Sequence, residues 1–141
     1  MADVRAFTMP ISTDVLRHSM ASTAAIARSW FENRSEIKTR EQFENHGQLG
    51  DSGSGAVYAY FTDKGAAVYV GQTGRAVKAR LHDQTSPHKK KAWWDTWSYM
   101  RFVPLECGVD RLVLESLLIA IYEPSANEKP KAKSINELFL L

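Results

Sequence analysis

The first third of the chain carries apolar residues at intervals of three and four positions, a spacing typical of one face of a helix. The residues with this spacing are Leu16, Met20, Ala24, Ala27, Trp30 and Phe31. Thr13 and Asp14 precede them and can cap a helix start. We therefore expect a helix over residues 14–32.

The pattern then changes. A short helical piece is expected at residues 39–45, and the glycine- and serine-rich stretch 47–55 predicts a polar joint. After the joint, aromatic and β-branched residues predict strands over residues 56–62 and 67–71, and the glycine in the turn between them suits a hairpin. A third strand is expected over residues 97–104.

Three further helices are expected around these strands. The first runs from Thr73 to about residue 84, and the second from Asp110 to about residue 122, where Pro124 stops it. Ser134, with a glutamate three positions later at Glu137, forms a capping box for a short C-terminal helix. Lys89 to Lys91 lie in the loop before the third strand.

These elements predict an α/β (α+β) fold in which helices flank a small, mainly antiparallel three-stranded sheet. Residues 1–54 form a helical N-terminal segment with its linker, and residues 55–141 form a domain. Residues 1–54 hold 6 Lys/Arg against 7 Asp/Glu, whereas residues 55–141 hold 12 against 9. This basic surplus permits a polyanionic partner without demanding one.

The overall composition, 44% hydrophobic and 24% charged, is ordinary for a globular protein. A lone cysteine, Cys107, excludes a disulfide within the chain, and no apolar stretch approaches the roughly 20 residues of a membrane span. The early acid Asp3 and the lack of an apolar run argue against a secretory signal or a transit peptide. A cytoplasmic protein without a membrane partner is expected.

Five landmarks in this pattern point to chemistry on phosphodiesters. Ala56-Val57-Tyr58 is followed eleven positions on by Tyr69-Val70-Gly71, and then by Arg80, Glu115 and Asn127. Their order and spacing over about residues 55 to 130 resemble the GIY-YIG nuclease family, although Ala56 stands where that family usually has glycine. The resemblance implies a metal-dependent endonuclease that hydrolyses nucleic acid, with DNA favoured and Mg²⁺ or Mn²⁺ as cofactor.

The resemblance implies that both tyrosines act on the water molecule that attacks the phosphorus atom. Tyr58 is the candidate general base, and Tyr69 is placed to bond phosphate or water beside it. A free tyrosine loses its proton near pH ~10, so a neighbouring cation or proton acceptor is needed. Gly71 is expected to let the following helix approach the site. Without these partners, Tyr58 would be interpreted as an aromatic that packs on a sheet face.

The family's helix arginine matches Arg80, whose guanidinium suits two phosphate oxygens at once, and Arg75 is the alternative. Four positions after Arg80 the family usually has histidine or tyrosine, but this chain has Gln84. Glutamine does not exchange protons near neutral pH, so His82 or His88 takes that role or the reaction proceeds without it. A surface histidine is the competing interpretation of His82.

Glu115 is the candidate metal ligand, because a carboxylate among apolar neighbours is costly unless it is paired or bound to metal. The apolar neighbours in sequence are Leu112, Val113, Leu114, Leu117, Leu118, Ile119 and Ile121. An oxygen ligand suits Mg²⁺ or Mn²⁺. The competing interpretation is a carboxylate on the solvent-facing stripe of a helix. Asn127, just past Pro124, is expected to brace the active-site backbone through its amide.

A run of cations and aromatics follows Pro87 and is a candidate nucleic-acid contact, because it can follow a phosphate backbone and stack on a base. The residues are His88, Lys89, Lys90, Lys91, Trp93 and Trp94. An equally weighted interpretation packs Trp93 or Trp97 on the sheet, with the lysines solvated.

A different class of function competes with the enzyme. Gln84 allows a nucleic-acid- or partner-binding module that keeps the fold without catalysis, although Glu115 favours the enzyme. Restriction, mobile-element cutting, repair and toxin roles stay open for a nuclease. The N-terminal helix stays open as a recognition element, a dimer or partner contact, or an immunity contact.

Overall fold

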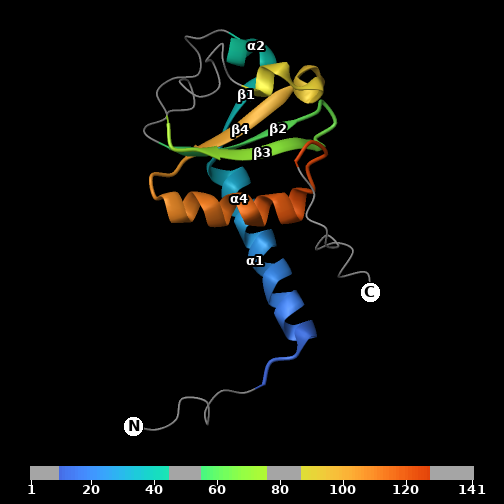
Figure 1. Ribbon diagram of the computed structural model, residues 1–141, viewed down its shortest axis with the longest axis vertical. Helices are drawn as coiled ribbons and strands as arrows, with labels where there is room; N and C mark the ends of the chain where they lie inside the picture. Colours follow the sequence, from blue (N-terminus) through green and yellow to red (C-terminus); the bar gives the residue numbers. More distant parts are fainter. Residues whose placement is uncertain (1–9, 45–54, 76–86, 128–141) are drawn as a thin grey trace.

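The computed structural model describes residues 10–44, 55–75 and 87–127 of the 141-residue chain (Figure 1). Within these residues, one antiparallel sheet has the strand order β1-β4-β2-β3. Its strands are β1 (Glu36–Thr39), β2 (Ala56–Phe61), β3 (Ala67–Thr73) and β4 (Tyr99–Pro104). The α+β class is confirmed, but the predicted three-stranded sheet is wrong, since four strands are present.

The strand that the sequence pattern misses is β1. It pairs only with β4, from Glu36 opposite Phe102 to Thr39 opposite Tyr99, and Ile37 is half exposed. An edge strand of four residues with charged positions buries too little to show an alternating apolar pattern. Its backbone pairing with β4 therefore defines it more than its own side chains do.

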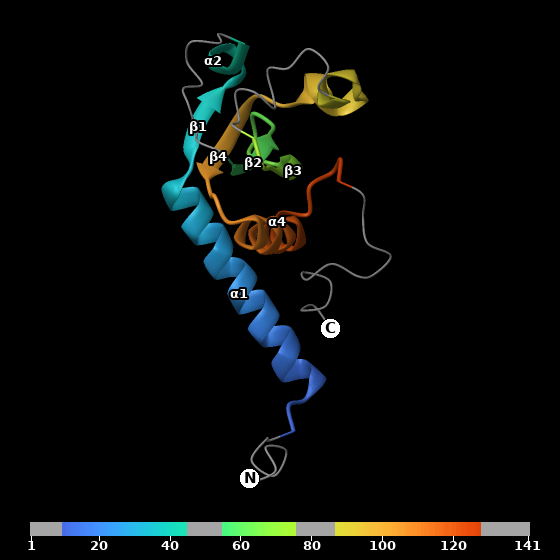
Figure 2. The same cartoon turned by 60° about the vertical axis from the view of Figure 1, so that its left-hand side comes forward.

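Helix α1 (Thr13–Arg34) begins and ends close to the predicted limits. Its N-cap is Ser12, one residue before the expected cap, and the Ser12 hydroxyl accepts a hydrogen bond from the Val15 amide. Figure 2 shows that α1 runs past one side of the sheet and α4, and that its N-terminal half projects away from both. Phe31, near its C-terminal end, is fully buried against the sheet and α4.

Two polar contacts hold the C-terminal end of α1. The Tyr122 hydroxyl donates to the Glu32 carboxylate at 2.7 Å, and the Arg101 guanidinium donates to the Glu32 carbonyl and to Ser35 Oγ. Burial raises the pKa of Tyr122 well above its ordinary value, and the hydrogen bond to Glu32 adds to that rise. The hydroxyl therefore stays protonated and keeps α1 attached to α4.

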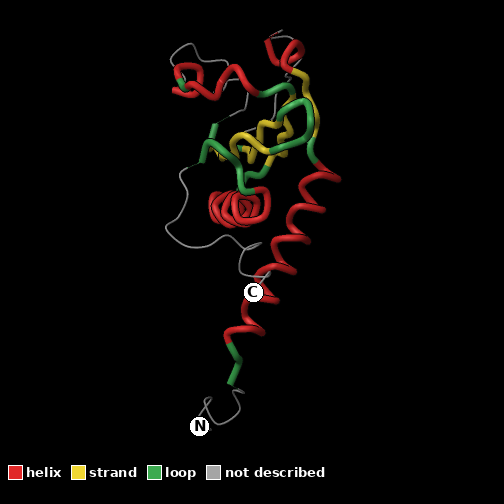
Figure 3. Tube along the Cα trace, turned by 90° about the vertical axis from the view of Figure 1, so that its right-hand side faces the viewer, coloured by secondary structure: helices red, strands yellow, loops and turns green. Residues whose placement is uncertain are grey.

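Helix α4 (Gly108–Tyr122) lies across one face of the sheet (Figures 1 and 3). The predicted start at Asp110 is wrong, because Cys107 is the N-cap residue and Asp110 lies in the first turn. At the other end, Glu123 adopts a left-handed conformation with φ of 49° and its amide closes the last turn. The described helices include none that is long and apolar enough to cross a membrane.

The opposite face is covered by α2 (Arg40–Glu44) and by two 3-10 turns, η3 (Pro87–Lys90) and η4 (Ala92–Thr96). Side chains of β2 alternate between these two faces, and every residue of the strand is buried. On the α2 face the buried residues are Phe43, Ala56, Tyr58, Tyr60, Val68, Trp97, Met100 and Phe102. On the α4 face they are Phe31, Val57, Ala59, Phe61, Val70, Val103, Leu114 and Leu118.

Two other predicted limits differ from the structure. Thr73 pairs with Ala56 as the last residue of β3, so this strand runs two residues past its predicted end at Gly71, and the third predicted strand begins at Tyr99. Residues 47–54 of the predicted joint at 47–55, residues 76–84 of the helix predicted from Thr73, and the C-terminal helix from Ser134 lie outside the described residues.

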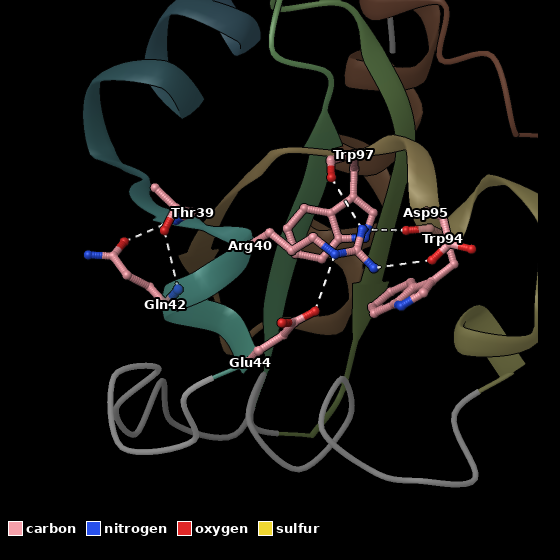
Figure 4. A network of polar contacts seen from close by, with 7 residues as sticks. All are labelled: Thr39, Arg40, Gln42, Glu44, Trp94, Asp95 and Trp97. Atoms are coloured by element: carbon pink, nitrogen blue, oxygen red, sulfur yellow. Dashed lines mark hydrogen bonds and ion pairs between the residues drawn. The ribbon is translucent and has the colours of Figure 1, made fainter.

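Arg40 connects α2 to the aromatic face (Figure 4). Its guanidinium donates to the carbonyls of Trp94 and Trp97 at 2.6 and 3.2 Å and stacks on both indole rings. Ion pairs to Glu44 and Asp95 complete its surroundings, but both carboxylates are largely exposed and contribute little. The two carbonyl bonds and the ring contacts therefore make Arg40 a structural residue.

Replacing Arg40 by methionine is expected to lower the free energy of unfolding by about 2 kcal/mol, because two carbonyls lose a charged donor. Urea unfolding measures the change. The control is Arg17→Met on the projecting half of α1, where the polar contact found among the described residues is a 3.4 Å pair with exposed Asp14 and the expected change is below about 0.5 kcal/mol. Equal losses in the two variants would contradict the structural role of Arg40.

Candidate functional site

The site begins with a buried contact between Tyr58 of β2 and His88 of η3. The Tyr58 hydroxyl oxygen lies 2.8 Å from His88 Nε2, and the two residues are 1% and 6% exposed. In one imidazole tautomer the phenol donates to Nε2; in the other, Nε2–H donates to the phenol oxygen. The pair can therefore carry a proton in either direction.

Tyr69 of β3 and Trp93 of η4 form the wall beside this pair. Tyr69 lies opposite Tyr60 in the sheet, which brings its ring to the same face as Tyr58, with ring centres 6.3 Å apart. The Tyr69 ring is 4.8 Å from the His88 ring and stacks on Trp93 at 5.0 Å and 7°. The structure thus brings two predicted tyrosines, one predicted histidine and one predicted tryptophan together.

Gly71 makes this close approach of the tyrosines possible. A Cβ atom at Gly71 would lie 2.7 Å from the Tyr58 hydroxyl and 2.9 Å from Cε1 of Tyr69. No side chain fits there unless one of the rings moves. The helix that Gly71 was expected to accommodate lies outside the described residues, and the visible role of Gly71 is to leave room for the two rings.

Asn127 holds the edge strand beside the site. Its side-chain Nδ2 donates to the Val70 carbonyl at 2.9 Å, and its Oδ1 accepts from the Val70 amide at 2.8 Å. The amide group thus pairs with β3 as the backbone of a further strand would. Because Val70 lies between Tyr69 and Gly71, this contact braces the backbone that carries the site.

Glu115 lies on α4, the layer on the other side of the sheet from Tyr58. Its side chain is half-buried, and burial raises the pKa of the carboxyl. In the described part of the chain its carboxylate has no hydrogen bond or ion pair with protein. One turn earlier, Arg111 bonds to Gln72, the neighbour of Gly71, so this side of α4 faces β3.

Within residues 10–44, 55–75 and 87–127, no group of three or more His, Cys, Asp or Glu side chains could hold a metal ion. A single carboxylate nevertheless fits Mg²⁺, which commonly keeps several waters and is held by one or two carboxylates together with substrate phosphates. Glu115 fits this requirement because it is a partly desolvated oxygen ligand without a protein partner in those ranges.

The predicted cationic residues are only partly described. Arg75 is exposed two residues after β3, and its backbone N–H donates to Thr73 Oγ1 at 3.0 Å. Lys89 and Lys90 lie in η3, and Lys91 is the exposed N-cap residue of η4.

Arg80 and His82 fall in residues 76–86, outside the described part, as does Gln84. Of the two histidine candidates, His88 is therefore the one whose contact with a tyrosine is observed.

Two features of the site were not predicted from the sequence. His88 is a candidate for proton exchange and for nucleic-acid contact, but nothing in the sequence indicates its contact with Tyr58, thirty positions away. The second feature is Arg111, the one basic residue in the apolar stretch 108–122. That isolation was a usable signal, because a cation in an apolar helix needs a specific partner.

Comparisons of the chain with models of protein families, with curated proteins and with solved structures found no match. The function proposed below therefore rests on the chemistry of these side chains and on the order of the sequence landmarks.

Proposed function

We propose that this protein is a metal-dependent endonuclease of the GIY-YIG type, which hydrolyses phosphodiester bonds of nucleic acid, with DNA as the favoured substrate. The observation that carries the proposal is the 2.8 Å contact between the Tyr58 hydroxyl and His88 Nε2. Phenols hold their protons at neutral pH, whereas imidazole exchanges protons there. A tyrosine that serves as a base needs such a partner. His88 can exchange a proton near neutral pH, which Gln84, at the position where the family usually has histidine or tyrosine, cannot do.

The proton path follows from this contact. The phenol oxygen of Tyr58 accepts a proton from the attacking water while its own proton passes to His88 Nε2. The water oxygen forms a bond to phosphorus, the bond from phosphorus to the 3′ oxygen breaks, and the 3′ oxygen is protonated from solvent. Tyr69, which contacts His88 and stacks on Trp93, restricts how the reacting groups move.

Charge on the phosphate requires cations in addition to this pair. Arg80 is proposed to hold the phosphoryl oxygens, and Lys90 and Lys91, both exposed near His88, to contact the neighbouring backbone. Glu115, on the α4 side of the sheet, is the residue proposed to hold Mg²⁺ or Mn²⁺. A phosphate reaches both this carboxylate and Tyr58 only at the outer edge of β3, where the two faces of the sheet meet. When bound, the metal supplies charge stabilisation for the leaving 3′ oxygen.

The test is a cleavage assay of the purified protein on supercoiled, linear and single-stranded DNA and on RNA, with Mg²⁺, Mn²⁺ or EDTA. We expect metal-dependent cutting of DNA that leaves 3′-hydroxyl and 5′-phosphate ends, identified by mass spectrometry. Intact nucleic acid in every lane, under conditions where salt-dependent binding is measured, would overturn the hydrolysis and leave the binding module in its place.

A further inference from the structure

The guanidinium of Arg111, in the first turns of α4, is held rigidly by neutral acceptors. Nε donates to Gln72 Oε1 at 3.0 Å, and Nη1 donates to the carbonyls of Leu105 and Glu106 at 3.0 and 2.6 Å. Within the described ranges no carboxylate forms an ion pair with it. Arg40, by contrast, has two carboxylate partners. The charge of Arg111 is therefore fixed in position without a counter-charge among these residues.

Three glycines surround this guanidinium, although they are far apart in the sequence. A Cβ at buried Gly55 would collide with Nη1, so this glycine makes room for the arginine. A Cβ at Gly74 or at Gly108 would lie 3.5 Å from Nη2. Both of these glycines are exposed. Nη2, the nitrogen for which no acceptor is found in the described part of the chain, therefore lies next to two exposed positions that lack side chains.

Glu115 would be the natural partner for this charge, because it lies one turn further along the same side of α4. The structure shows no ion pair between the two in the described part, and the guanidinium is turned instead toward β3 and the Leu105–Glu106 carbonyls. Arg111 and Glu115 thus remain available for separate ligands of opposite charge.

We propose that Arg111 binds a backbone phosphate of the nucleic acid through Nη2, in the opening between Gly74 and Gly108. The identity of the polymer rests on the proposed function; the phosphate chemistry rests on the arginine. An arginine whose plane is already fixed loses little conformational freedom when it binds an oxyanion. Its partner Gln72 follows Gly71 in the edge strand β3, so the bound phosphate lies on the α4 side of the same strand whose other face carries the tyrosine site, and it positions the nucleic acid along that edge.

The first experiment observes the subsite directly. The wild-type protein, labelled with ¹⁵N, is titrated with inorganic phosphate and with the dinucleotide dTpdT while the Arg111 Nε–H signal and the Gly74 and Gly108 amides are followed. We expect all three signals to shift together and to saturate with dTpdT. Binding of dTpdT that leaves the three signals unmoved would overturn the proposal.

The second experiment changes the opening without removing the arginine. Gly108→Ala adds a methyl group at ordinary contact distance from Nη2, so the fold tolerates it, and Arg111→Lys keeps the charge but loses the planar fork. Each is expected to weaken dTpdT binding roughly tenfold, the effect of one charge-assisted hydrogen bond. Arg28→Gln, which removes one positive charge from the exposed face of α1, is the control and is expected to bind within about twofold of wild type.

Cleavage and binding then separate the two proposals. If the wild type cuts DNA and both variants bind and cut equally well, the Arg111 subsite is wrong and the nuclease stands. If nothing is cut but both variants lose dTpdT binding while Arg28→Gln retains it, the subsite stands and the hydrolysis is wrong. Thermal melting of each variant shows that the comparison is made between folded proteins.

Discussion

Replacing Tyr58 by phenylalanine is expected to lower the rate of DNA cleavage by about 10²–10⁴-fold, the usual contribution of a general base. The variant loses one oxygen atom and keeps the ring contacts with Tyr60 and Tyr69. His88 Nε2 then lacks its 2.8 Å partner, which is expected to lower the free energy of unfolding by about 1–3 kcal/mol. Single-turnover cleavage and urea unfolding measure the two effects.

Tyr60→Phe is the matched control. Tyr60 lies two residues further along β2, is equally buried, and packs on Trp97 at 4.8 Å rather than on His88. Loss of its hydroxyl is expected to change the cleavage rate by less than about threefold, because a residue outside the proton path leaves the transition state unchanged. Cleavage by Tyr58→Phe at the wild-type rate would remove Tyr58 from the mechanism.

His88→Gln tests whether the two residues act together. Glutamine can still bond to the phenol but cannot exchange protons near neutral pH. If Tyr58 and His88 form one proton path, each single variant loses about as much activity as the double variant. The effects of substituting residues that act as a unit do not add. Multiplied losses in the double variant would show independent roles.

The hydrophobic pattern predicted the elements that bury a continuous face. The spacing that leads to buried Ala24 and Phe31 identifies α1, and the apolar stretch around Leu114 and Leu118 identifies α4. Strand β1 has no such face; it is a strand because β4 offers it hydrogen-bonding groups. A strand that forms mainly because a neighbouring strand pairs with it shows only a weak pattern of apolar residues in its own sequence.

The same distinction applies to the site. The proximity of Tyr58 and Tyr69 follows from a hairpin with a short turn, so it could be predicted. The contact of Tyr58 with His88 depends on how the 3-10 turns pack over the sheet, and the openness around Arg111 depends on glycines from three segments. Such long-range arrangements arise from tertiary packing, which local periodicity does not encode.

Replacing Glu115 by glutamine is expected to separate stability from activity. The cleavage rate at low millimolar Mg²⁺ should fall by about 10²-fold or more, because charge stabilisation by a metal is worth several kcal/mol. The fold should become more stable near neutral pH, because glutamine avoids the desolvation of a carboxylate that is half-buried. Cleavage kinetics and thermal melting from pH 4 to pH 8 measure both effects.

The sign of the pH dependence follows from the raised pKa of Glu115. An unfolded glutamate titrates near pH ~4.3, and burial places the folded value above it. Between the two values the folded state binds more protons, so wild-type stability falls as pH rises through that window. Relative to Glu115→Gln, the wild type is therefore least stable above the window, and the difference shrinks as pH falls through the window, because the carboxyl becomes protonated.

Metal binding is expected to offset the destabilising effect of the ionised Glu115 carboxylate, and only in proteins that keep this carboxylate. Mg²⁺ bound to Glu115 favours the ionised form, so adding Mg²⁺ at pH 8 should raise the melting temperature of the wild type and leave Glu115→Gln unchanged. Glu106→Gln, at an exposed position just before α4, is the control and should respond to Mg²⁺ as the wild type does. Equal stabilisation of all three proteins would place the metal elsewhere, and undiminished cleavage by Glu115→Gln would exclude this carboxylate from the reaction.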